Sequence, residues 1–310
     1  MFSDRIDELF NAQLNEWELA GTNYRQLEKV KTRQIDFDGF QVLIQFNPER
    51  MRSSAAKVDS KSIGARPCFL CEVNRPDQQK GALFENEFTV LVNPFPIFKR
   101  HLTIPSERHT GQLIGNNFGK MLKLAEALPA FTIFYNGPQC GASAPDHFHF
   151  QAGNRGFMPV ERDFSGGTFT MLLSAKPGIE IWKWKSYLRG IITLKGKDKE
   201  KLNNVFRHFF DKFSILQPDR PEPMVNILAY HAGGDWIVHI IPRKLHRPSQ
   251  FFAEGSAQII LSPASVDLGG VIITPREEDF HKISRTDVAD IFTQVCLKDD
   301  ELPGFFSEII

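Results

Sequence analysis

The sequence has few cysteines, no long apolar run and no excess of either charge. Its 310 residues contain four cysteines, too few to hold a chain of this length together by disulfides. No apolar run reaches the roughly 20 residues that a membrane-spanning helix needs. The first residues, MFSDRIDELF, lack the basic and apolar segments of a secretory signal. The 37 basic residues balance 37 acidic ones, which argues against a dedicated nucleic-acid-binding protein. We therefore expect a cytoplasmic protein with no membrane or nucleic-acid partner.

Hydrophobic residues are plentiful, and their spacing predicts a mixed fold. They make up 42% of the chain and include 28 phenylalanines. Steps of three and four predict helices near residues 6–17, 114–128 and 202–213. Alternating or β-rich runs predict strands at 34–46 (a hairpin with a type I′ turn at Asp38-Gly39), 88–96, 101–105, 131–136, 146–152, 181–194 and 224–243. A glycine-rich stretch at 153–167 separates two halves of similar pattern. We expect an α+β fold with two halves, 1–164 and 165–310, each an antiparallel sheet with packed helices.

The motif His147-Phe148-His149-Phe150-Gln151 is the strongest candidate for a functional site. Alternate side chains of a strand share a face, so the two phenylalanines would enter a core while the three polar side chains line the opposite face. That face could be an ordinary solvent-exposed strand edge. The preceding loop contains glycine and other small residues, which let backbone N–H groups approach an anion closely. The combination favours a phosphate-binding site.

This stretch, NGPQCGASAPDHFHFQ, resembles the active-site segment of the histidine-triad superfamily. The resemblance is to the branch of galactose-1-phosphate uridylyltransferase-like, dinucleoside-polyphosphate phosphorylase-like and GDP-sugar phosphorylase-like enzymes. It covers about residues 45–155, and the matching positions are Asn136, Ser143, His147, His149 and Gln151. The asparagine is followed directly by Gly137, which departs from the family pattern Asn-x-Gly. The second half shares only the general pattern of elements, and from this repeat we expect two histidine-triad-like halves.

The resemblance also implies a mechanism. His149 would attack the α-phosphorus of a nucleotide and form a covalent nucleotidyl-histidine. Gln151 would donate its amide to a phosphate oxygen, while Ser143 and the backbone around Gly141 and Ala142 would hold the same group. Relatives that hydrolyse nucleotides have a histidine where Gln151 stands. A glutamine cannot supply a proton, so Gln151 favours a transferase or phosphorylase.

Cys68-x-x-Cys71 is the second motif, and it has three interpretations. It predicts a zinc site, a redox pair or two buried thiols. Flanking prolines favour a tight zinc knuckle, which needs two further ligands from His101, His109 and His147. The family pattern implies His109 and His147, with a structural zinc that fixes the strand bearing the nucleophile. His101 would replace His109 or face the nucleotide.

Several other residues are candidates for substrate contacts. Arg50 resembles the family's early nucleotide-contacting arginine, and the basic loop at 47–67 also contains Arg52, Lys57 and Lys61; a solvated surface charge is the alternative for each. Asn93 matches a turn that in relatives lies against the ribose, with plain turn chemistry as the alternative. In the second half, His231, His239, Arg243, His246 and Arg247 would either bring cations to the sugar-phosphate end of the cleft or decorate the surface.

These observations favour a nucleotidyltransferase or phosphorylase with zinc as cofactor. The substrates would be a nucleotide sugar or a dinucleoside polyphosphate together with phosphate or a sugar 1-phosphate. The sequence is compatible with a monomer or a homodimer. The alternatives are a nucleotide hydrolase of the same superfamily, a non-catalytic nucleotide-binding module, or an enzyme that processes nucleic-acid ends. Zero net charge and the lack of a basic arm count against the last.

Overall fold

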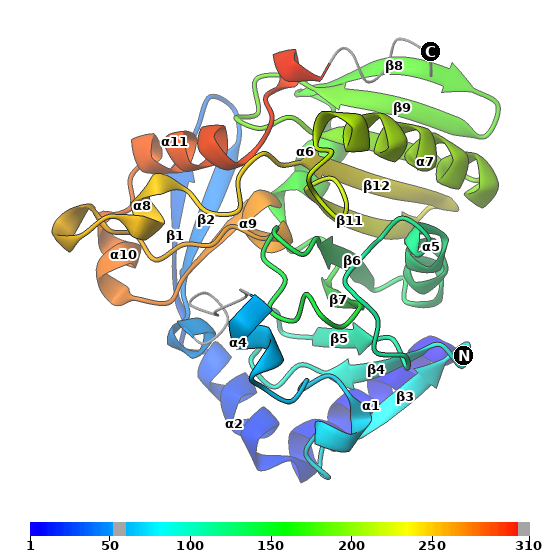
Figure 1. The fold of residues 1–310 in the computed structure, drawn as a ribbon, viewed down its shortest axis with the longest axis vertical. Coiled ribbons are helices and arrows are strands. Elements are labelled where there is room, and N and C mark those ends of the chain that lie inside the picture. Colours follow the sequence, from blue (N-terminus) through cyan, green and yellow to red (C-terminus); the bar gives the residue numbers. More distant parts are fainter. Residues whose placement is uncertain (52–59, 303–310) are drawn as a thin grey trace.

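The fold is built around one ten-stranded antiparallel sheet, seen in a computed structural model that describes residues 1–51 and 60–302 (Figure 1). From one edge to the other, its strands are β3 (Gly81–Phe84), β4 (Phe88–Val92), β5 (His101–Pro105), β7 (His149–Asn154), β6 (Phe131–Asn136), β11 (Val225–Ala232), β12 (Asp235–Pro242), β10 (Ile192–Gly196), β9 (Ile179–Trp184) and β8 (Thr170–Lys176).

The two halves of the chain contribute five strands each, in the same order. In the first half the spatial order is β3-β4-β5-β7-β6, and in the second it is β8-β9-β10-β12-β11. Each half also places one long helix between its third and fourth strands: α5 (Phe118–Ala127) and α7 (Lys199–Leu216). The halves meet where β6 pairs antiparallel with β11 and Asn136 lies opposite Asn226. The predicted α+β repeat is therefore present as a repeat of topology.

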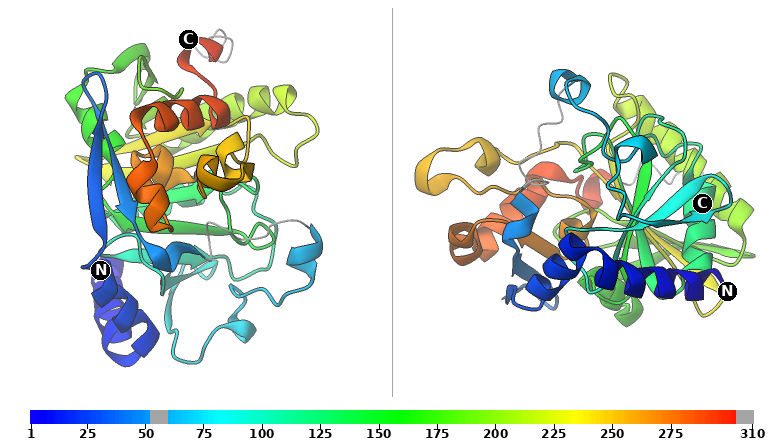
Figure 2. Two further views of the ribbon diagram at one scale, coloured as in Figure 1. Left: turned by 90° about the vertical axis from the view of Figure 1, so that its left-hand side faces the viewer. Right: turned by 90° about the horizontal axis from the view of Figure 1, so that it is seen from below.

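A second, three-stranded sheet combines residues from both ends of the chain. β1 (Lys31–Asp36) and β2 (Gln41–Phe46) form the predicted hairpin, and β13 (Val271–Thr274) adds parallel to β2. Figure 2 shows this sheet beside the C-terminal helices, which are α8 (Ser249–Phe252), α9 (Ser265–Leu268), α10 (Glu277–Lys282) and α11 (Arg285–Val295).

Two hydrophobic cores lie on opposite faces of the large sheet. One packs α5, α7 and α1 (Phe2–Glu16) against side chains that include Phe148 and Phe150. In α7, apolar side chains four, three and four residues apart form the buried stripe, at Leu202, Phe206, Phe209 and Phe213. The other core packs the small sheet and α11 against the opposite face of the large sheet, at Phe134, Leu228 and Ile241. The remaining helices are α2 (Glu18–Leu27), α4 (Ser60–Gly64) and α6 (Pro159–Gly166).

Three local predictions were wrong. The turn at Asp38-Gly39 is not type I′, because that turn needs positive φ at both residues and only Gly39 has it. The segment 181–194 is two strands, β9 and β10, joined by a loop in which Ser186 and Leu188 have positive φ. The strand predicted at 146–152 begins later, at His149, because the preceding backbone bonds to a loop: Phe148 N–H donates to Thr110 O at 2.6 Å.

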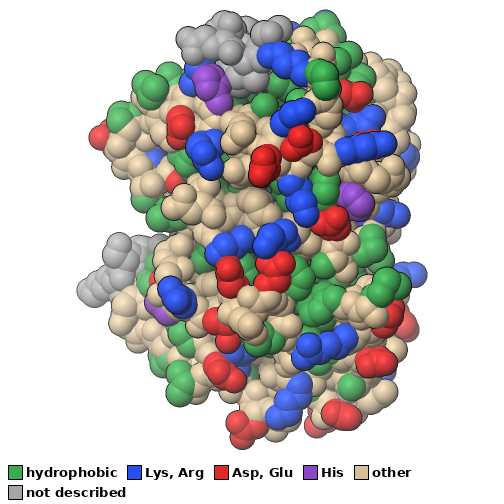
Figure 3. Space-filling model, turned by 90° about the vertical axis from the view of Figure 1, so that its right-hand side faces the viewer, with side chains coloured by type: hydrophobic (Ala, Val, Ile, Leu, Met, Phe, Trp, Pro, Cys, Tyr) green, Lys and Arg blue, Asp and Glu red, His purple; other side chains and the backbone are tan. Residues whose placement is uncertain are grey.

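The surface agrees with the balanced charge of the sequence. Basic and acidic side chains are interspersed over the face seen in Figure 3. Among the described residues, no helix is both long and apolar enough to cross a bilayer.

Candidate active site

Strand β7 presents His149 and Gln151 on the face opposite Phe148 and Phe150. The two phenylalanine rings lie 5.0 Å apart, edge to face, within the core beneath α5. Gln151 lies opposite Phe134 of β6, whose side chain belongs to the other core. The predicted alternation therefore holds for these four residues. His147 precedes the strand, so its side chain turns toward the cysteine knuckle instead of joining the row.

The imidazole of His149 is held in one tautomer. Its Nδ1 lies 2.8 Å from the backbone oxygen of His147, and a carbonyl can only accept, so Nδ1 carries the proton. Nε2 is then left with its lone pair. The side chain is 3% exposed, and burial lowers the pKa of His149 to about 4. The ring is thus a neutral, nucleophilic imidazole at physiological pH.

Gln151 is oriented by His101. The backbone N–H of Ile97 donates to Nδ1 of His101 at 3.3 Å, so the ring proton is on Nε2. That Nε2–H donates to Oε1 of Gln151 at 3.0 Å. Burial lowers the pKa of His101 to about 3, which keeps this ring neutral too. Because Oε1 of Gln151 faces His101, the two N–H donors of this amide do not.

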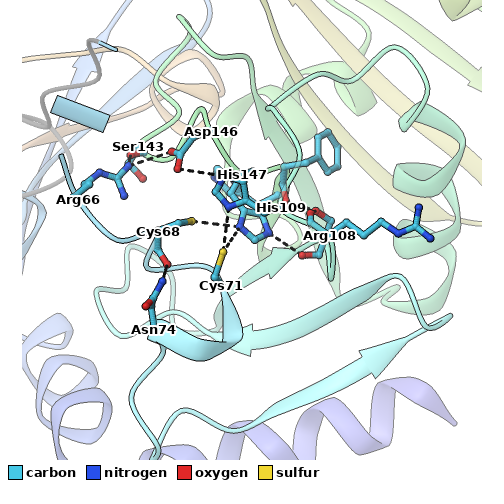
Figure 4. Close-up of polar contacts among 12 residues, drawn as sticks. Arg66, Cys68, Cys71, Asn74, Arg108, His109, Ser143, Asp146 and His147 are labelled. Carbon is cyan, nitrogen blue, oxygen red and sulfur yellow. Dashed lines mark hydrogen bonds and ion pairs between the residues drawn. The ribbon is translucent and has the colours of Figure 1, made fainter. Parts of the chain in front are cut away.

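Four predicted metal ligands converge beside β7. The ligand atoms of Cys68, Cys71, His109 and His147 all lie within 4.8 Å of one another. Figure 4 shows the four side chains pointing toward one another. The His147 Nδ1 lies 3.3 Å from Cys68 Sγ and 3.5 Å from Cys71 Sγ. Tetrahedral zinc with two sulfur and two nitrogen ligands places neighbouring S and N atoms about 3.6 Å apart. The residues present therefore fit a zinc ion. Of the two alternative histidines, His109 lies in the cluster, whereas His101 bonds to Gln151 instead.

This cluster connects directly to the candidate nucleophile. His147 donates from Nε2 to the backbone oxygen of Ser106 at 2.8 Å, so its ring is fixed on both sides. The backbone oxygen of the same residue accepts the Nδ1 proton of His149. A metal bound here would immobilise the carbonyl that sets the tautomer of His149.

The loop between β6 and β7 is pinned at several points. Arg66 donates to the backbone oxygen of Ser143 at 3.2 Å and pairs with Asp146 at 3.3 Å (Figure 4). Gly141 has φ +94°, and a Cβ there would lie 2.5 Å from the Cβ of Ala264. Ala142 next to it is buried. These contacts fix the loop against Arg66 on one side and Ala264 on another.

Asn136 connects this loop to the second half of the chain. Its Oδ1 accepts from the side chain of Asn226 and from the backbone and hydroxyl of Ser265, at 2.7–2.8 Å. The side chain is 5% exposed. The structure gives Asn136 a joining role at the centre of the large sheet.

Arg50 lies near enough to His101 for its charge to act on that ring. Its guanidinium donates to Phe95 O at 2.9 Å, and its charge helps to lower the pKa of His101. Burial lowers the pKa of Arg50 to about 10, so it stays a cation at neutral pH. Arg52, Lys57 and the side chain of Lys61 lie outside the described residues.

The side chain of Asn93 takes part in a turn. Its Oδ1 accepts from Phe95 N–H at 2.9 Å and its Nδ2 donates to Thr103 at 2.8 Å. The turn chemistry weighed as the alternative is therefore present, and a contact with ribose stays a prediction.

Two residues of the basic group in the second half, His239 and Arg243, are buried. His239 is buried against Thr193, and burial lowers its pKa to about 3. Arg243 is fully buried and donates to Asn226 and to the backbone oxygens of Val295 and Pro263, among others. These side chains stabilise the second half. Burial and the charges of Arg247 and Arg243 lower the pKa of His246, so these three residues lie near one another, and a role for them in substrate binding stays a prediction.

Comparison with known proteins shows two family matches and a shared fold. Residues 9–154 match a family model described as a domain of unknown function, DUF4922, and residues 165–308 match the GDPGP1-like C-terminal domain. The yeast Ap4A phosphorylase Apa2 superposes with a TM-score of 0.62 at 15% identity, covering 92% of this chain and 98% of that one. The same enzyme in complex with Ap4A gives a TM-score of 0.63 at 15% identity, and the match covers 96% of this chain and 97% of that one. No curated protein sequence matches the chain.

These matches confirm the resemblance and the fold class. The α+β architecture and the relation to the phosphorylase-like branch of the histidine-triad superfamily agree with what the sequence predicted.

Proposed function

We propose that this protein is a nucleotidyltransferase or phosphorylase that acts on a nucleotide sugar or a dinucleoside polyphosphate through a nucleotidyl-histidine at His149. The observation that carries the proposal is the tautomer of His149, with Nδ1–H bonded to His147 O and the Nε2 lone pair left for attack. The matches to the GDPGP1-like domain and to an Ap4A phosphorylase support it, because both names denote nucleotide chemistry on this fold.

The reaction proceeds in two steps, and the ring of His149 is positively charged only in the intermediate, because Nδ1 keeps its proton when Nε2 bonds to phosphorus. Nε2 of His149 attacks the α-phosphorus, an N–P bond forms, and the bond from phosphorus to the bridging oxygen breaks with its electrons on the departing phosphate. An oxygen of inorganic phosphate or of a sugar 1-phosphate then attacks the same phosphorus, and the N–P bond breaks to restore neutral His149. Phosphate groups leave and enter without a proton donor, which suits the glutamine at position 151.

Neighbouring groups would stabilise the phosphoryl group during both steps. The oriented N–H donors of Gln151, the Ser143 hydroxyl and the backbone near Gly141 and Ala142 would bond its oxygens. Arg50 would contribute a positive charge, and Asn93 would contact the ribose. Cys68, Cys71, His109 and His147 would hold a zinc ion that supplies no chemistry to the transfer and cross-links the start of β7. Residues 1–164 would form the catalytic half, with residues 165–310 completing the cleft.

The decisive experiment traps the adduct. The protein is incubated with Ap4A, a GDP-hexose or a UDP-hexose, each labelled in the α-phosphate. We expect a label on the protein that survives alkali, is lost in acid and is absent from His149→Ala. His239→Ala is the matched control, because His239 is a buried histidine of the second half with no place in the proposed site. Release of the label by added phosphate supports a phosphorylase, while release by water alone indicates a hydrolase. Equal labelling of His149→Ala would overturn the assignment.

A further inference from the structure

Gln112 lies in the loop before α5 and bonds both backbone groups of His149. The N–H of His149 donates to its Oε1 at 2.8 Å, and its Nε2 donates to His149 O at 2.9 Å. The same Nε2 donates to Asn136 O at 3.0 Å. Gln112 is 1% exposed, and all three of these bonds are buried. One side chain thus joins the end of β6 to the start of β7.

The amide occupies a gap in the sheet. The ladder between β6 and β7 ends at Phe134 opposite Gln151, and the same register continued would place Asn136 opposite His149. In a regular antiparallel pair, those two residues would bond each other's backbone. Here the strands separate, and the amide of Gln112 takes the place of the missing strand residue. Without it, the backbone N–H and C=O of His149 would be buried without partners.

Gln112 itself is fixed from two sides. Its backbone N–H donates to Pro145 O at 3.0 Å, and its carbonyl accepts from the hydroxyl of Tyr135 at 2.9 Å. It follows the predicted metal ligand His109 by three residues. The metal cluster therefore holds the ring of His149 through His147 O, and Gln112 holds the backbone of His149, on which the alignment of that ring with His147 O depends.

We propose that Gln112 is a positioning residue for the nucleophile, which aims the imidazole of His149 by clamping its main chain in the gap between β6 and β7. The inference rests on the proposed function. A glutamine is suited to this position because the site needs one acceptor and two donors on a single planar group. Attack on phosphorus requires the nitrogen within a few tenths of an ångström of its working position, so loosening this clamp lowers the rate of adduct formation.

The test compares two buried glutamines. Gln13 is also 1% exposed and also bridges main chain, donating to Gln78 O at 2.9 Å and accepting from Lys80 N–H at 3.0 Å, but it belongs to α1. We expect Gln112→Leu to form the His149 adduct about 100-fold more slowly, with the dissociation constant of AMP or GMP changed less than threefold. Gln13→Leu should lose similar stability and keep the wild-type rate. Equal rates in Gln112→Leu and wild type overturn the proposal, as does an equal rate loss in Gln13→Leu.

A measurement without substrate separates this inference from the proposed function. Long-range ¹⁵N–¹H spectra report the tautomer of His149 directly. We expect one Nδ1–H tautomer in wild type and Gln13→Leu, and a tautomer mixture in Gln112→Leu. If Gln112→Leu does not fold, Gln112→Glu replaces it in this measurement, because glutamate keeps the size and the acceptor of glutamine. We expect the same mixture of tautomers in that variant. An unchanged single tautomer in the folded variants would refute the clamp, whereas a wild-type protein that forms no adduct would refute only the function.

Discussion

The Nε2 atom of His101 lies 3.0 Å from the Oε1 atom of Gln151, on neighbouring strands of the large sheet. Since Nδ1 of the histidine accepts a hydrogen bond from Ile97 N–H, the ring proton is on Nε2. This proton bonds the amide oxygen of Gln151, so the amide nitrogen is the end left to face the site. An amide that rotated freely would present oxygen to a phosphate half of the time. In the proposed reaction, His101 would therefore act on the phosphoryl group through Gln151.

This relationship predicts non-additive effects of two substitutions. Gln151→Ala removes a donor to the phosphoryl group and should slow transfer by about 10²- to 10³-fold. His101→Phe should keep the packing against Phe98 and Phe134, whose rings lie 5.2 and 6.0 Å away, yet slow transfer by about 10- to 100-fold. The double variant should be no slower than Gln151→Ala. Single-turnover rates of the three variants give the coupling, and additive losses would show that His101 acts on its own.

Metal analysis tests the four-ligand cluster. Protein purified without chelators should contain one zinc per chain, and Cys71→Ser should contain close to none. A structural metal contributes to folding, so a loss of about 3 kcal/mol would lower Tm by roughly 6–12 °C. Cys140→Ser is the matched control, because Cys140 is a buried thiol apart from the cluster and should leave the zinc content unchanged. A zinc content unaffected by Cys71→Ser would contradict the assigned ligand set.

The sequence predicted those parts of the site that depend on local patterns. Phe148 and Phe150 alternate with His149 and Gln151 in a short span, so strand periodicity alone separates the core face from the site face. The spacing of Cys68 and Cys71 identified a knuckle, and the structure brings His109 and His147 to it.

What the sequence did not reveal depends on contacts between distant segments. Gln112 stands in a polar loop, and nothing nearby indicates that its amide fills a gap between two strands 24 and 37 residues further along. Arg243 resembles a candidate phosphate ligand by composition. Only the fold shows that its guanidinium is buried among backbone carbonyls.

The contact between Gly141 and Ala264 predicts a large loss of stability on adding a methyl group. Gly141→Ala combines a left-handed backbone at φ +94° with a Cβ placed 2.5 Å from the Cβ of Ala264. We expect the free energy of unfolding to fall by more than about 2 kcal/mol, since the left-handed conformation alone costs about 1–2 kcal/mol. Gly156→Ala is the control, because Gly156 has φ +82° and nothing within 4 Å of the added Cβ. Urea unfolding of both variants separates the two contributions. Equal losses would mean that the loop moves aside without cost.

The carboxyl of Glu222 predicts a specific dependence of stability on pH. It accepts from the backbone of Ile114 at 2.7 Å and lies 2.5 Å from the hydroxyl of Tyr135, which also contacts Gln112 O. Burial raises the pKa of Glu222 from 4.5 to about 7. Between these two values the folded protein holds a proton that the unfolded chain has lost, so the free energy of unfolding falls as pH rises and levels off above pH 7.

Glu222→Gln removes this titration and keeps the size of the side chain. Plotted against pH, the free energy of unfolding of wild type minus that of the variant should fall by about 3 kcal/mol between pH 4.5 and 8, because each unit of pKa difference corresponds to 1.36 kcal/mol. Taking the difference cancels the other titrating groups, which the two proteins share. Urea unfolding at closely spaced pH values measures it. A difference that stays flat across this range would show that Glu222 is ionised in the folded protein at its ordinary pKa. The Tyr135 hydroxyl would then donate to the carboxylate, leaving the carbonyl of Gln112 without its partner.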